Sequence, residues 1–476
     1  MCGSADRSSS TTDQTFAAHD LARQKEATLT KYVRPSLAFP AGRTLVEYDR
    51  VHRSCYTDQT IFEEELKNIF YKTWIYAAHE SQIPKPGDYV GFMLGRQSML
   101  VVGGAQGEVN VLHNRCPHRG AVLCNERKGN TGGLFTCSYH AWQFGLDGKL
   151  AALPAPDGYK ETRLCKGDPA ADMKSAARVS SYRGFIFASL SETGPSLDRW
   201  LGNGRRAFDD MCDRAPDGDV EIVNSCFRIV QNNNWKIFLE NQLDAVHASI
   251  THISAAKAAT DTEKEIKEET GEDAPYFYKY ISSLSTPLPR WATLETRAYP
   301  YGHCLLGGYL GLRPTDPDSV FYENIMREKY GAEKAEEILS RDVHHILIYP
   351  CLSVQPAFQQ LRAIRPLGPD KTLTELWHFR LKGAPEPIYR RSLAYYNLIN
   401  SPSTLVNADD LINFWRCQEG LMGEEASEWV SFHRNAGQDI TSSEMTRSAN
   451  GLSEMPMREM FRAWSEYMAE GVENLG

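Results

Sequence analysis

The stretches Cys116-Pro117-His118 and Cys137-Ser138-Tyr139-His140 decide how the N-terminal half of this chain folds. Each stretch holds one thiol and one imidazole, two or three positions apart, and eighteen residues separate the two stretches. Gly120, Gly132 and Gly133 lie between them, where glycine permits tight backbone turns. We therefore expect two facing loops that each present one sulfur and one nitrogen ligand.

Four such donors suit two kinds of metal site. A Rieske cluster of two irons and two sulfides takes two thiolates on one iron and two imidazoles on the other. Zinc also accepts two cysteines and two histidines, but zinc fingers pair cysteine with cysteine and histidine with histidine. The mixed pairs predict a Rieske [2Fe-2S] cluster with Cys116, His118, Cys137 and His140 as ligands, and zinc or a chance spacing is the alternative.

The composition is that of an ordinary globular protein of two or three domains, with 476 residues, 42% hydrophobic and 24% charged. A net charge of -9 argues against a nucleic-acid or anionic-membrane partner. No apolar run approaches the ~18 residues of a membrane span, and Met1 to Thr12 lacks the apolar core of a signal peptide. Eleven cysteines without a regular framework predict reduced thiols in a cytoplasmic protein.

The pattern along the chain predicts three regions. Residues 1–45 form an N-terminal tail or arm that is partly disordered, 46–190 a Rieske domain, and 191–476 a catalytic domain. In the Rieske domain, apolar spacing predicts a helix within 60–80, and short runs predict strands at 89–93, 98–102, 109–112 and 182–188. Gly, Pro and Asp between 190 and 218 predict a linker.

The C-terminal region mixes both kinds of element. Residues 321–339 and most of 421–474 read as helices, and 346–349, 360–365 and 373–379 read as strands. The fold class is therefore α+β, with an antiparallel β Rieske domain followed by a catalytic domain in which helices surround an antiparallel sheet.

A second group of possible ligands lies in the helix-forming stretch from Asn232 to His252. Asp244 and His247 are three apart and share a helical face. His247 and His252 are five apart, which in a regular helix leaves them about 140° out of alignment. Two ligands of one metal need a common direction, so we predict a break or a π-type turn between these histidines.

Two imidazoles and one carboxylate form the facial triad of oxygen-activating Fe(II). The best source of the carboxylate is Asn407-Ala408-Asp409-Asp410, in which Asn407 resembles a helix N-cap. Position alone does not choose between Asp409 and Asp410, because the helix dipole favours any acid near a helix start.

Several other features have two interpretations. The charged stretch 260–275 predicts a solvated helix or loop, or else a mobile cover over the site. Arg362 or Arg365 could grip a substrate carboxylate, although a surface salt bridge is the simpler role. His344 and His345 are interpreted as structural. No P-loop or dinucleotide fingerprint is found, so electrons from NAD(P)H must arrive through another protein.

Together these motifs resemble the α subunit of Rieske non-haem iron aromatic-ring-hydroxylating oxygenases, over nearly all of the chain after about residue 40. The family's Tyr-His-Gly-Trp stands here as Tyr139-His140-Ala141-Trp142. Asn234-Trp235-Lys236, Glu240-Asn241 and Asp244-x2-His247-x4-His252 carry the catalytic part of the resemblance.

The resemblance implies that His247, His252 and Asp410 bind mononuclear iron, and that Asn241 lies near the iron without being a firm ligand. It implies that Asp244 bridges His247 to His140 of a neighbouring subunit, in an α3 or α3β3 ring with a small β subunit. A ferredoxin or NAD(P)H reductase would supply electrons.

By the same resemblance, which is greatest to the benzoate-type branch, the expected activity is (cis-di)hydroxylation of an aromatic ring, and the expected substrate is an aromatic carboxylic acid. A monooxygenase or demethylase on the same scaffold, or a Rieske electron carrier without oxygenase chemistry, is the alternative.

Overall fold

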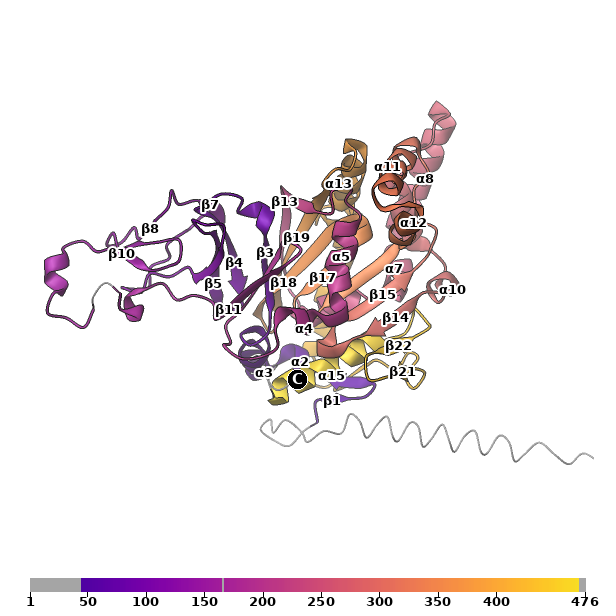
Figure 1. The fold of residues 1–476 in the computed structure, drawn as a ribbon. Coiled ribbons are helices and arrows are strands. Elements are labelled where there is room, and N and C mark those ends of the chain that lie inside the picture. The colour runs from indigo at the N-terminus through magenta and orange to yellow at the C-terminus, as the bar shows by residue number, and fades with distance from the viewer. Residues whose placement is uncertain (1–43, 165–166, 471–476) are drawn as a thin grey trace, which may run out of the picture.

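The computed structural model describes residues 44–164 and 167–470, so nearly all of the predicted tail, residues 1–45, lies outside the described residues. Figure 1 shows two parts side by side: small antiparallel sheets at the left, and a large sheet with helices around it at the right. The α+β class and the antiparallel sheets in both parts are confirmed. The proposed domain boundary at 190/191 stays a prediction.

The N-terminal part contains a four-stranded antiparallel sheet in the order β6-β5-β4-β7. Three of its strands confirm the predicted ones. A three-stranded sheet, β10-β9-β8, lies beside the second ligand loop. The bounds are β4 Asp88–Leu94, β5 Gln97–Gly103, β6 Val109–His113, β7 Lys128–Asn130, β8 Phe135–Thr136, β9 Gln143–Phe144 and β10 Leu150–Ala152.

Two predictions in this part are wrong in detail. The strand expected at 182–188 is a hairpin of β11 (Arg178–Tyr182) and β12 (Phe185–Ser189). Its two turn residues, Arg183 and Gly184, both have positive φ, 50° and 84°, which a tight hairpin turn requires. The helix expected over 60–80 ends early, because β3 (Ile75–His79) pairs with β12 and its burial overrides helical spacing.

The segment before β3 is short and helical, and it packs on the C-terminal part. It comprises α2 (Ser54–Thr57), α3 (Gln59–Glu65) and a π-turn at Leu66–Phe70. Just upstream, β1 (Val46–Glu47) and β2 (Arg50–His52) form a sheet with β20 (Trp429–Ser431). The first described residues are thus tied to the C-terminal region by backbone hydrogen bonds.

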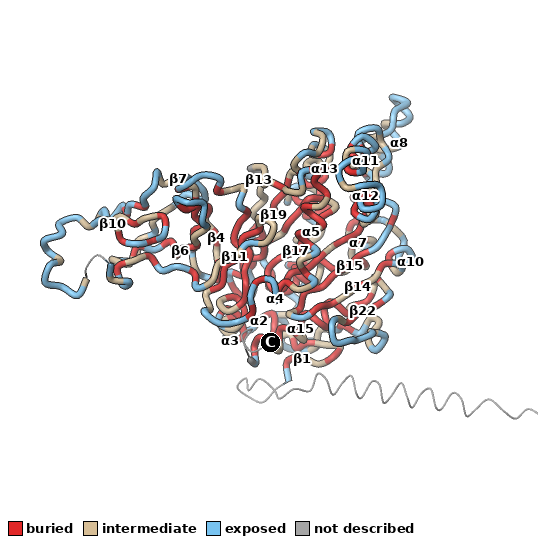
Figure 2. The backbone as a smooth tube through the Cα atoms, viewed as in Figure 1, coloured by how far each residue is buried: buried red, intermediate tan, exposed pale blue. Residues whose placement is uncertain are grey.

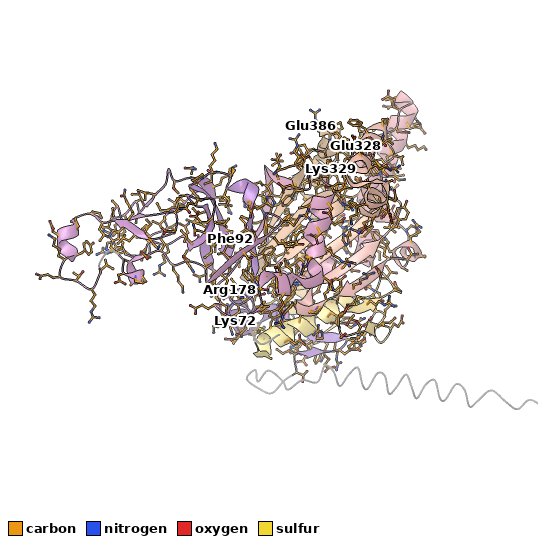
Figure 3. The ribbon with its side chains drawn as sticks, viewed as in Figure 1. Lys72, Phe92, Arg178, Glu328, Lys329 and Glu386 are labelled. Carbon is orange, nitrogen blue, oxygen red and sulfur yellow. The ribbon has the colours of Figure 1, made fainter. Side chains whose placement is uncertain are left out.

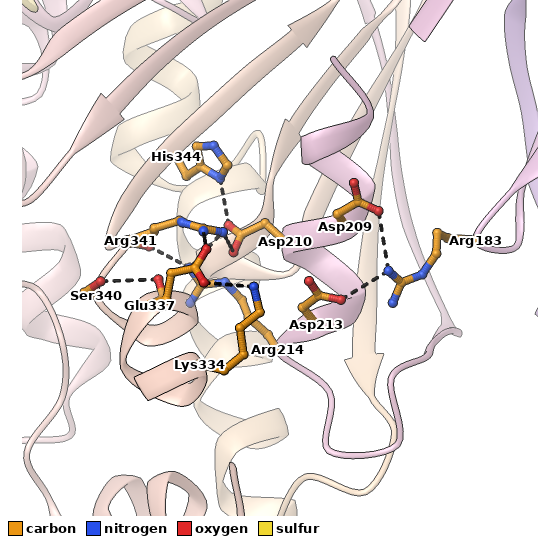
Figure 4. A network of polar contacts seen from close by, with 10 residues as sticks. All are labelled: Arg183, Asp209, Asp210, Asp213, Arg214, Lys334, Glu337, Ser340, Arg341 and His344. Atoms are coloured by element: carbon orange, nitrogen blue, oxygen red, sulfur yellow. Dashed lines mark hydrogen bonds and ion pairs between the residues drawn. The ribbon is translucent and has the colours of Figure 1, made fainter. Parts of the chain in front are cut away.

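The predicted linker at 190–218 is also wrong. It folds into α4 (Leu197–Leu201) and α5 (Arg206–Asp213), whose apolar side chains are buried, those of α4 beside β11 and those of α5 against the large sheet. Asp210 on α5 is buried, and it accepts from His344 Nδ1 at 2.7 Å and pairs with Arg214 at 3.3 Å (Figure 4). Glycine and aspartate in this segment therefore end helices and form buried ion pairs, and they do not make a flexible connection. The structural role predicted for His344 is confirmed by its contact with Asp210.

Nine antiparallel strands form the large sheet, which contains the three strands predicted in this region. Figure 2 shows buried residues running along these strands, and exposed residues at the far end of α8. In spatial order the strands are β13 (Val220–Gln231), β19 (Lys371–Leu381), β18 (Gln360–Gly368), β17 (Leu352–Gln355), β16 (Val343–Ile348), β15 (Cys304–Gly308), β14 (Glu295–Ala298), β22 (Thr446–Ser448) and β21 (Ile440–Thr441).

The helices of this part agree with the sequence in some places and differ in others. Helices α11 and α12 confirm the prediction at 321–339, and the exposed α8 confirms a solvated helix near 260. Between 423 and 454, predicted helical, the chain forms loops and short strands. The bounds are α6 Trp235–Asn241, α7 Ala245–Thr251, α8 Ile253–Thr270, α9 Phe277–Ser282, α10 Leu288–Trp291, α11 Pro317–Tyr330, α12 Ala332–Leu339, α13 Glu386–Asn400, α14 Leu405–Met422 and α15 Met455–Glu470.

A cationic side chain helps to join the two parts. The Arg365 guanidinium lies 5.3 Å from the ring centroid of Phe92, which Figure 3 shows between the small sheets and the large one. Arg178, labelled in the same view, makes a similar contact within the N-terminal part, 4.7 Å from the ring of Trp74. None of the helices in residues 44–164 and 167–470 combines the length and apolar character that crossing a bilayer requires.

Candidate metal centres

The two cysteine–histidine loops bring their four donors together. The Cys116 and Cys137 thiols are buried and within hydrogen-bonding reach of each other. The His118 and His140 rings are partly exposed, and their centroids are 4.6 Å apart. Sulfur donors inside and nitrogen donors at the surface are the arrangement that one thiolate-bound and one imidazole-bound iron would need.

The two loops have the same backbone design. In each, the N–H four residues after the cysteine donates to the cysteine carbonyl at 2.9 Å, and the cysteine N–H donates to the carbonyl five residues ahead at 2.8 Å. The residue at the fourth position must adopt positive φ, and it is Gly120 at 76° in one loop and Ala141 at 52° in the other. An alanine in this conformation costs roughly 1 kcal/mol.

Neighbouring groups hold the ligands in place. The buried Trp142 ring lies parallel to His118, at 2° and 4.8 Å between centroids, so it covers that imidazole. Burial raises the pKa of the Cys137 thiol, but hydrogen bonds from the backbone N–H groups of Tyr139 and His140 bring it below its usual value. Amide donors to sulfur and an aromatic cover both tune a cluster's potential.

The second site begins with an anchored helix. The Asn234 side chain caps α6 by accepting from the Lys236 N–H at 3.1 Å. The buried Glu65 carboxylate accepts from Trp235 Nε1 at 2.8 Å and from Lys236 Nζ at 2.5 Å. Trp464 Nε1 donates to the same carboxylate at 2.8 Å. The Asn-Trp-Lys motif therefore fixes α6 to the segments around it and does not itself bind a metal.

The predicted break near the histidines is confirmed, and it falls at His252 itself. Helix α7 ends at Thr251, His252 has φ −97° and ψ 15°, and α8 begins at Ile253. The chain is interrupted once more before α7, because the Asp244 side chain accepts from the Val246 N–H at 3.0 Å and caps that helix. These two interruptions turn the imidazoles toward each other, with ring centroids 5.5 Å apart.

One ligand atom each from His247, His252 and Asp410 lies within 4.8 Å of the other two. Asp410 Oδ1 is 3.8 Å from His247 Nε2 and 3.3 Å from His252 Nε2. Burial raises the pKa of Asp410, but the two imidazoles lower it below its usual value, which favours the carboxylate. The three side chains could hold one divalent cation between them.

The structure separates the two neighbouring aspartates. Asp409 Oδ2 lies 3.6 Å from His252 Nδ1, the ring nitrogen opposite the one that faces Asp410. A carboxylate in that position orients a metal-bound imidazole. The expectation that Asn407 caps the helix is wrong: α14 begins three positions earlier, with Thr404 as N-cap, and the Asn407 side chain donates to the Asn400 carbonyl at 2.6 Å.

Two amides beside the triad form a short chain of hydrogen bonds. Asn241 Nδ2 donates to Asp410 Oδ1 at 3.2 Å, and Gln242 Nε2 donates to Asn241 Oδ1 at 3.1 Å. Asn241 therefore contacts a triad residue, where the sequence placed it. Gln242 was missed, and no motif could have indicated it, because its partners Ser353 and Arg362 come from the large sheet.

Asp244 stands on the opposite side of His247. One oxygen, Oδ1, is held by the Val246 N–H and by Arg434 Nη2 at 3.1 Å. The other, Oδ2, lies 4.0 Å from His247 Nδ1. Its side chain is 25% exposed, so a group from outside this chain can reach it.

A cavity of 110 Å³ opens onto the triad. On the same measure one water needs roughly 10–15 Å³, so the cavity has room for a small organic molecule. Its apolar walls include Phe238, Leu284, Trp291, Leu306, Leu376 and Phe414. Its polar walls include Gln242, Arg362 and His345. Burial lowers the pKa of the His345 imidazole to about 3. A second cavity, of 80 Å³, is lined by none of the triad residues.

The structure assigns different places to three residues that the sequence left open. Arg365 does form a salt bridge, 3.2 Å from Glu375, but that pair is buried rather than at the surface. Arg362 lines the cavity instead. His345 also lines it, so a purely structural role does not describe this histidine.

Two family models match the chain. The Rieske [2Fe-2S] domain matches residues 73–166, and the ring hydroxylating alpha subunit (catalytic domain) matches residues 198–470, more than half of the chain. The chain belongs to the Rieske ring-hydroxylating dioxygenase alpha subunits. The predicted fold and family are thereby confirmed.

Relatives of this dioxygenase subunit share about a third of its residues. It is 32% identical to toluate 1,2-dioxygenase subunit alpha from Pseudomonas putida, over 80% of this chain and 82% of the relative. It is 31% identical to the anthranilate 1,2-dioxygenase large subunit from Acinetobacter baylyi, over 81% and 80%. A solved naphthalene 1,2-dioxygenase with indole bound shares its fold, with a TM-score of 0.75, 24% identity, and coverage of 88% of this chain and 92% of that one.

Dioxygenase subunits of this family carry a Rieske [2Fe-2S] cluster and mononuclear iron. The donors present fit both groups. Two cysteines and two histidines converge from the two loops, and two histidines and an aspartate converge between α7 and α14.

Proposed function

We propose that this chain is the oxygenase component of a multicomponent system that hydroxylates the ring of an aromatic carboxylic acid. The observation that carries the proposal is the convergence of His247, His252 and Asp410 within 4.8 Å at the wall of a cavity with apolar sides. An electron carrier needs no such site, whereas oxygen activation at Fe(II) needs two imidazoles, one carboxylate and open positions.

We assign Cys116, Cys137, His118 and His140 as cluster ligands, and His247, His252 and Asp410 as iron ligands. When bound, the cluster supplies single electrons and the ferrous ion activates O2. The protein's own residues orient and shield: the Trp142 ring covers His118, the Asp409 carboxylate lies 3.6 Å from His252 Nδ1, and Asn241 donates to Asp410. The apolar walls would hold the ring and exclude water.

Electrons must pass between the two centres, and this chain keeps them in different parts. Figure 1 shows the small sheets that carry the cluster loops at the left, whereas α7 lies at the far side of the large sheet. A head-to-tail ring, α3 or α3β3, would bring the cluster of one subunit to the iron of the next. Asp244 would then accept from His247 and from His140 of the neighbouring subunit, with Arg434 holding the carboxylate in position.

The names of the relatives support the proposed substrate class. Toluate, anthranilate and 2-halobenzoate, named for three of them, are all aromatic carboxylates. A ferredoxin or NAD(P)H reductase would deliver the electrons, and a small β subunit would complete the assembly. We favour addition of both oxygen atoms over monohydroxylation or demethylation.

A product screen tests this function. The purified subunit, with both metals and any β subunit, is incubated with reductase, NADH, 18O2 and a panel of aromatic acids, and the products are analysed by mass. We expect two labelled oxygens in the product. One labelled oxygen would show a monooxygenase, and no product from any aromatic compound, at full metal loading, would refute the proposal.

Electron paramagnetic resonance checks the two centres independently. We expect a Rieske signal from the reduced cluster and a separate ferrous signal that appears with nitric oxide. The second signal should be lost when Asp410 is replaced.

A further inference from the structure

Arg362, which is half-buried at the cavity, differs from the buried arginines in what surrounds its charge. Arg214, Arg365 and Arg458 are each paired with an aspartate or glutamate, at 3.3, 3.2 and 2.7 Å. Within the part of the chain that the structure describes, no carboxylate oxygen comes within 4.0 Å of the Arg362 guanidinium. A cation withdrawn from water without an anion is unstable unless something compensates it.

Among the described residues, the hydrogen-bond acceptors of the Arg362 guanidinium are all neutral amides. Nη1 donates to the side-chain oxygen of Gln242, and Nη2 lies 3.4 Å from Gln360 Oε1 and 3.3 Å from Asn400 Oδ1. The buried Nε has no hydrogen-bond partner among the described residues. Two of the five N–H donors of the fork are therefore left without an acceptor.

The acid whose charge reaches Arg362 is Asp410. We have assigned Asp410 to the iron, and a metal-bound carboxylate has its charge engaged by the cation. The guanidinium thus remains the positive wall of the cavity. Burial lowers the pKa of Arg362, but an arginine side chain keeps its proton at neutral pH.

Arg362 and the triad line the same cavity. The same cavity is also lined by apolar side chains that a ring can contact, among them Phe238 and Leu376. A ligand with a carboxylate at one end and a ring at the other matches this combination of a cationic side chain, apolar walls and a metal site. An uncharged hydrocarbon would leave the guanidinium without an anion.

We infer that Arg362 binds the carboxylate of the aromatic substrate and thereby selects aromatic acids over uncharged aromatics. This rests on the proposed function, since it gives that site its substrate anchor. Strand β18 fixes the Arg362 backbone, and Gln242, Gln360 and Asn400 hold the guanidinium, so the anchor is rigid before the substrate arrives.

The alternative role for Arg362 is to position the site. Through Gln242 and Asn241 its guanidinium is connected to Asp410. A positioning role would affect every substrate equally, and it would reduce turnover rather than binding. An anchoring role affects only ligands with a carboxylate. The two roles are separated by comparing an acid with its uncharged amide.

The test measures binding to the metal-loaded subunit by calorimetry. The probes are benzoate, 2-aminobenzoate and 3-methylbenzoate, each compared with its primary amide. For the wild type we expect at least one acid to bind about 10-fold or more tightly than its amide, as a charge-assisted hydrogen bond provides. If no acid binds more tightly than its amide, the inference is overturned without any variant.

Arg362→Gln should weaken the binding of that acid by about 10- to 100-fold and change the binding of the amide by less than about threefold. Arg362→Lys keeps the positive charge but loses the planar set of N–H donors. Its affinity for the acid should therefore lie between those of the wild type and Arg362→Gln. If Arg362→Gln does not retain its iron, Arg362→Lys decides the matter in the same way. Equal losses for the acid and the amide would assign Arg362 a positioning role and overturn the inference.

Arg380→Gln is the matched control. Arg380 lies on the adjacent strand β19, and its guanidinium is 37% exposed and paired with Glu386 at 2.5 Å. Its loss removes the same charge without touching the cavity, so neither probe should bind differently. A turnover measurement distinguishes this inference from the proposed function. Selective binding of acids without any oxygenated product would refute the proposed function, but it would still support carboxylate binding by Arg362.

Discussion

The two metal centres of this subunit obtain their ligands in different ways. The cluster loops supply all four donors from residues 116–140, and each loop closes on itself through backbone hydrogen bonds. The proposed iron site joins His247 on α7 and His252 at the helix break to Asp410 on α14. The first site depends on two local turns, whereas the second depends on the packing of a whole domain.

The supports of the two sites differ accordingly. At the cluster, backbone amides and Trp142 complete the site, all within a few residues of the ligands. At the iron, support comes from Glu65 on α3, from Arg434 near the C-terminus and from amides that reach the large sheet. Substitutions in the core should therefore disturb the iron site first and leave the cluster in place.

The largest expected effect distinguishes the two neighbouring aspartates. Asp410→Ala removes a donor of the triad, so we expect loss of the mononuclear iron and of turnover. Asp409→Ala removes only a partner of His252 and should weaken iron binding by roughly 10–100-fold. Iron analysis and the visible spectrum of the cluster measure both effects, and the cluster should be unchanged in each variant. Equal iron loss in the two variants would contradict the assignment.

Asp244→Asn tests the connection between the centres. The amide keeps the size of the side chain but cannot accept from two imidazoles with both oxygens, so turnover should fall by about 100-fold while both metals remain. Glu454→Gln is the control, because Glu454 lies 3.4 Å from the same Arg434 without contacting either centre. Wild-type turnover in Asp244→Asn, at equal iron content, would count against the bridge.

Glu65→Gln tests whether the core supports only one site. It leaves the buried Lys236 without an anion and should reduce the free energy of unfolding by about 3–5 kcal/mol. Glu63→Gln, on the same helix, breaks a pair with Arg96 in which the two side chains are 33% and 50% exposed, and should cost less than about 1 kcal/mol. Denaturant unfolding followed by circular dichroism gives both values. Iron should be lost at lower denaturant than the cluster in Glu65→Gln, and simultaneous loss would weaken the comparison.

The smallest expected effect concerns the one departure from the family's loop sequence. Ala141→Gly relieves an alanine at positive φ and should stabilise its loop by about 1 kcal/mol. Gly120→Ala is the mirror change and should destabilise the other loop by a similar amount, with Arg115 Nε 3.3 Å from the added Cβ. The rate of cluster bleaching under air compares the two variants with the wild type. Slower bleaching in Gly120→Ala would show that the positive φ at this position does not determine the stability of the cluster loops.

The same contrast explains what the sequence could predict. The convergence of the four cysteine and histidine donors was predictable because a short spacing and its glycines contain both loops. The break near His252 was predictable because two ligands five residues apart cannot converge on a regular helix. The roles of Asp409 and Arg362 were not, because they depend on which faces of α14 and β18 meet the cavity. The structure places them, and nothing in the local sequence does.

The errors have physical causes of the same kind. The strand β3 was mistaken for helix because a fully buried strand has no alternating pattern to distinguish it. The supposed linker at 190–218 contains helices whose polar residues pair inside the protein, as Asp210 does with His344. Local composition misleads wherever distant partners satisfy buried polar groups.

A mixed assembly tests most directly whether electrons pass from the cluster of one subunit to the iron of another. Cys116→Ser should remove the cluster from one set of chains, and Asp410→Ala the iron from the other. Each variant alone should be inactive with reductase and O2, but assemblies co-expressed from both should recover about a quarter of the wild-type rate, the share of junctions with an intact pair. Mixed assemblies that are shown to contain both chains and yet stay inactive would contradict the account.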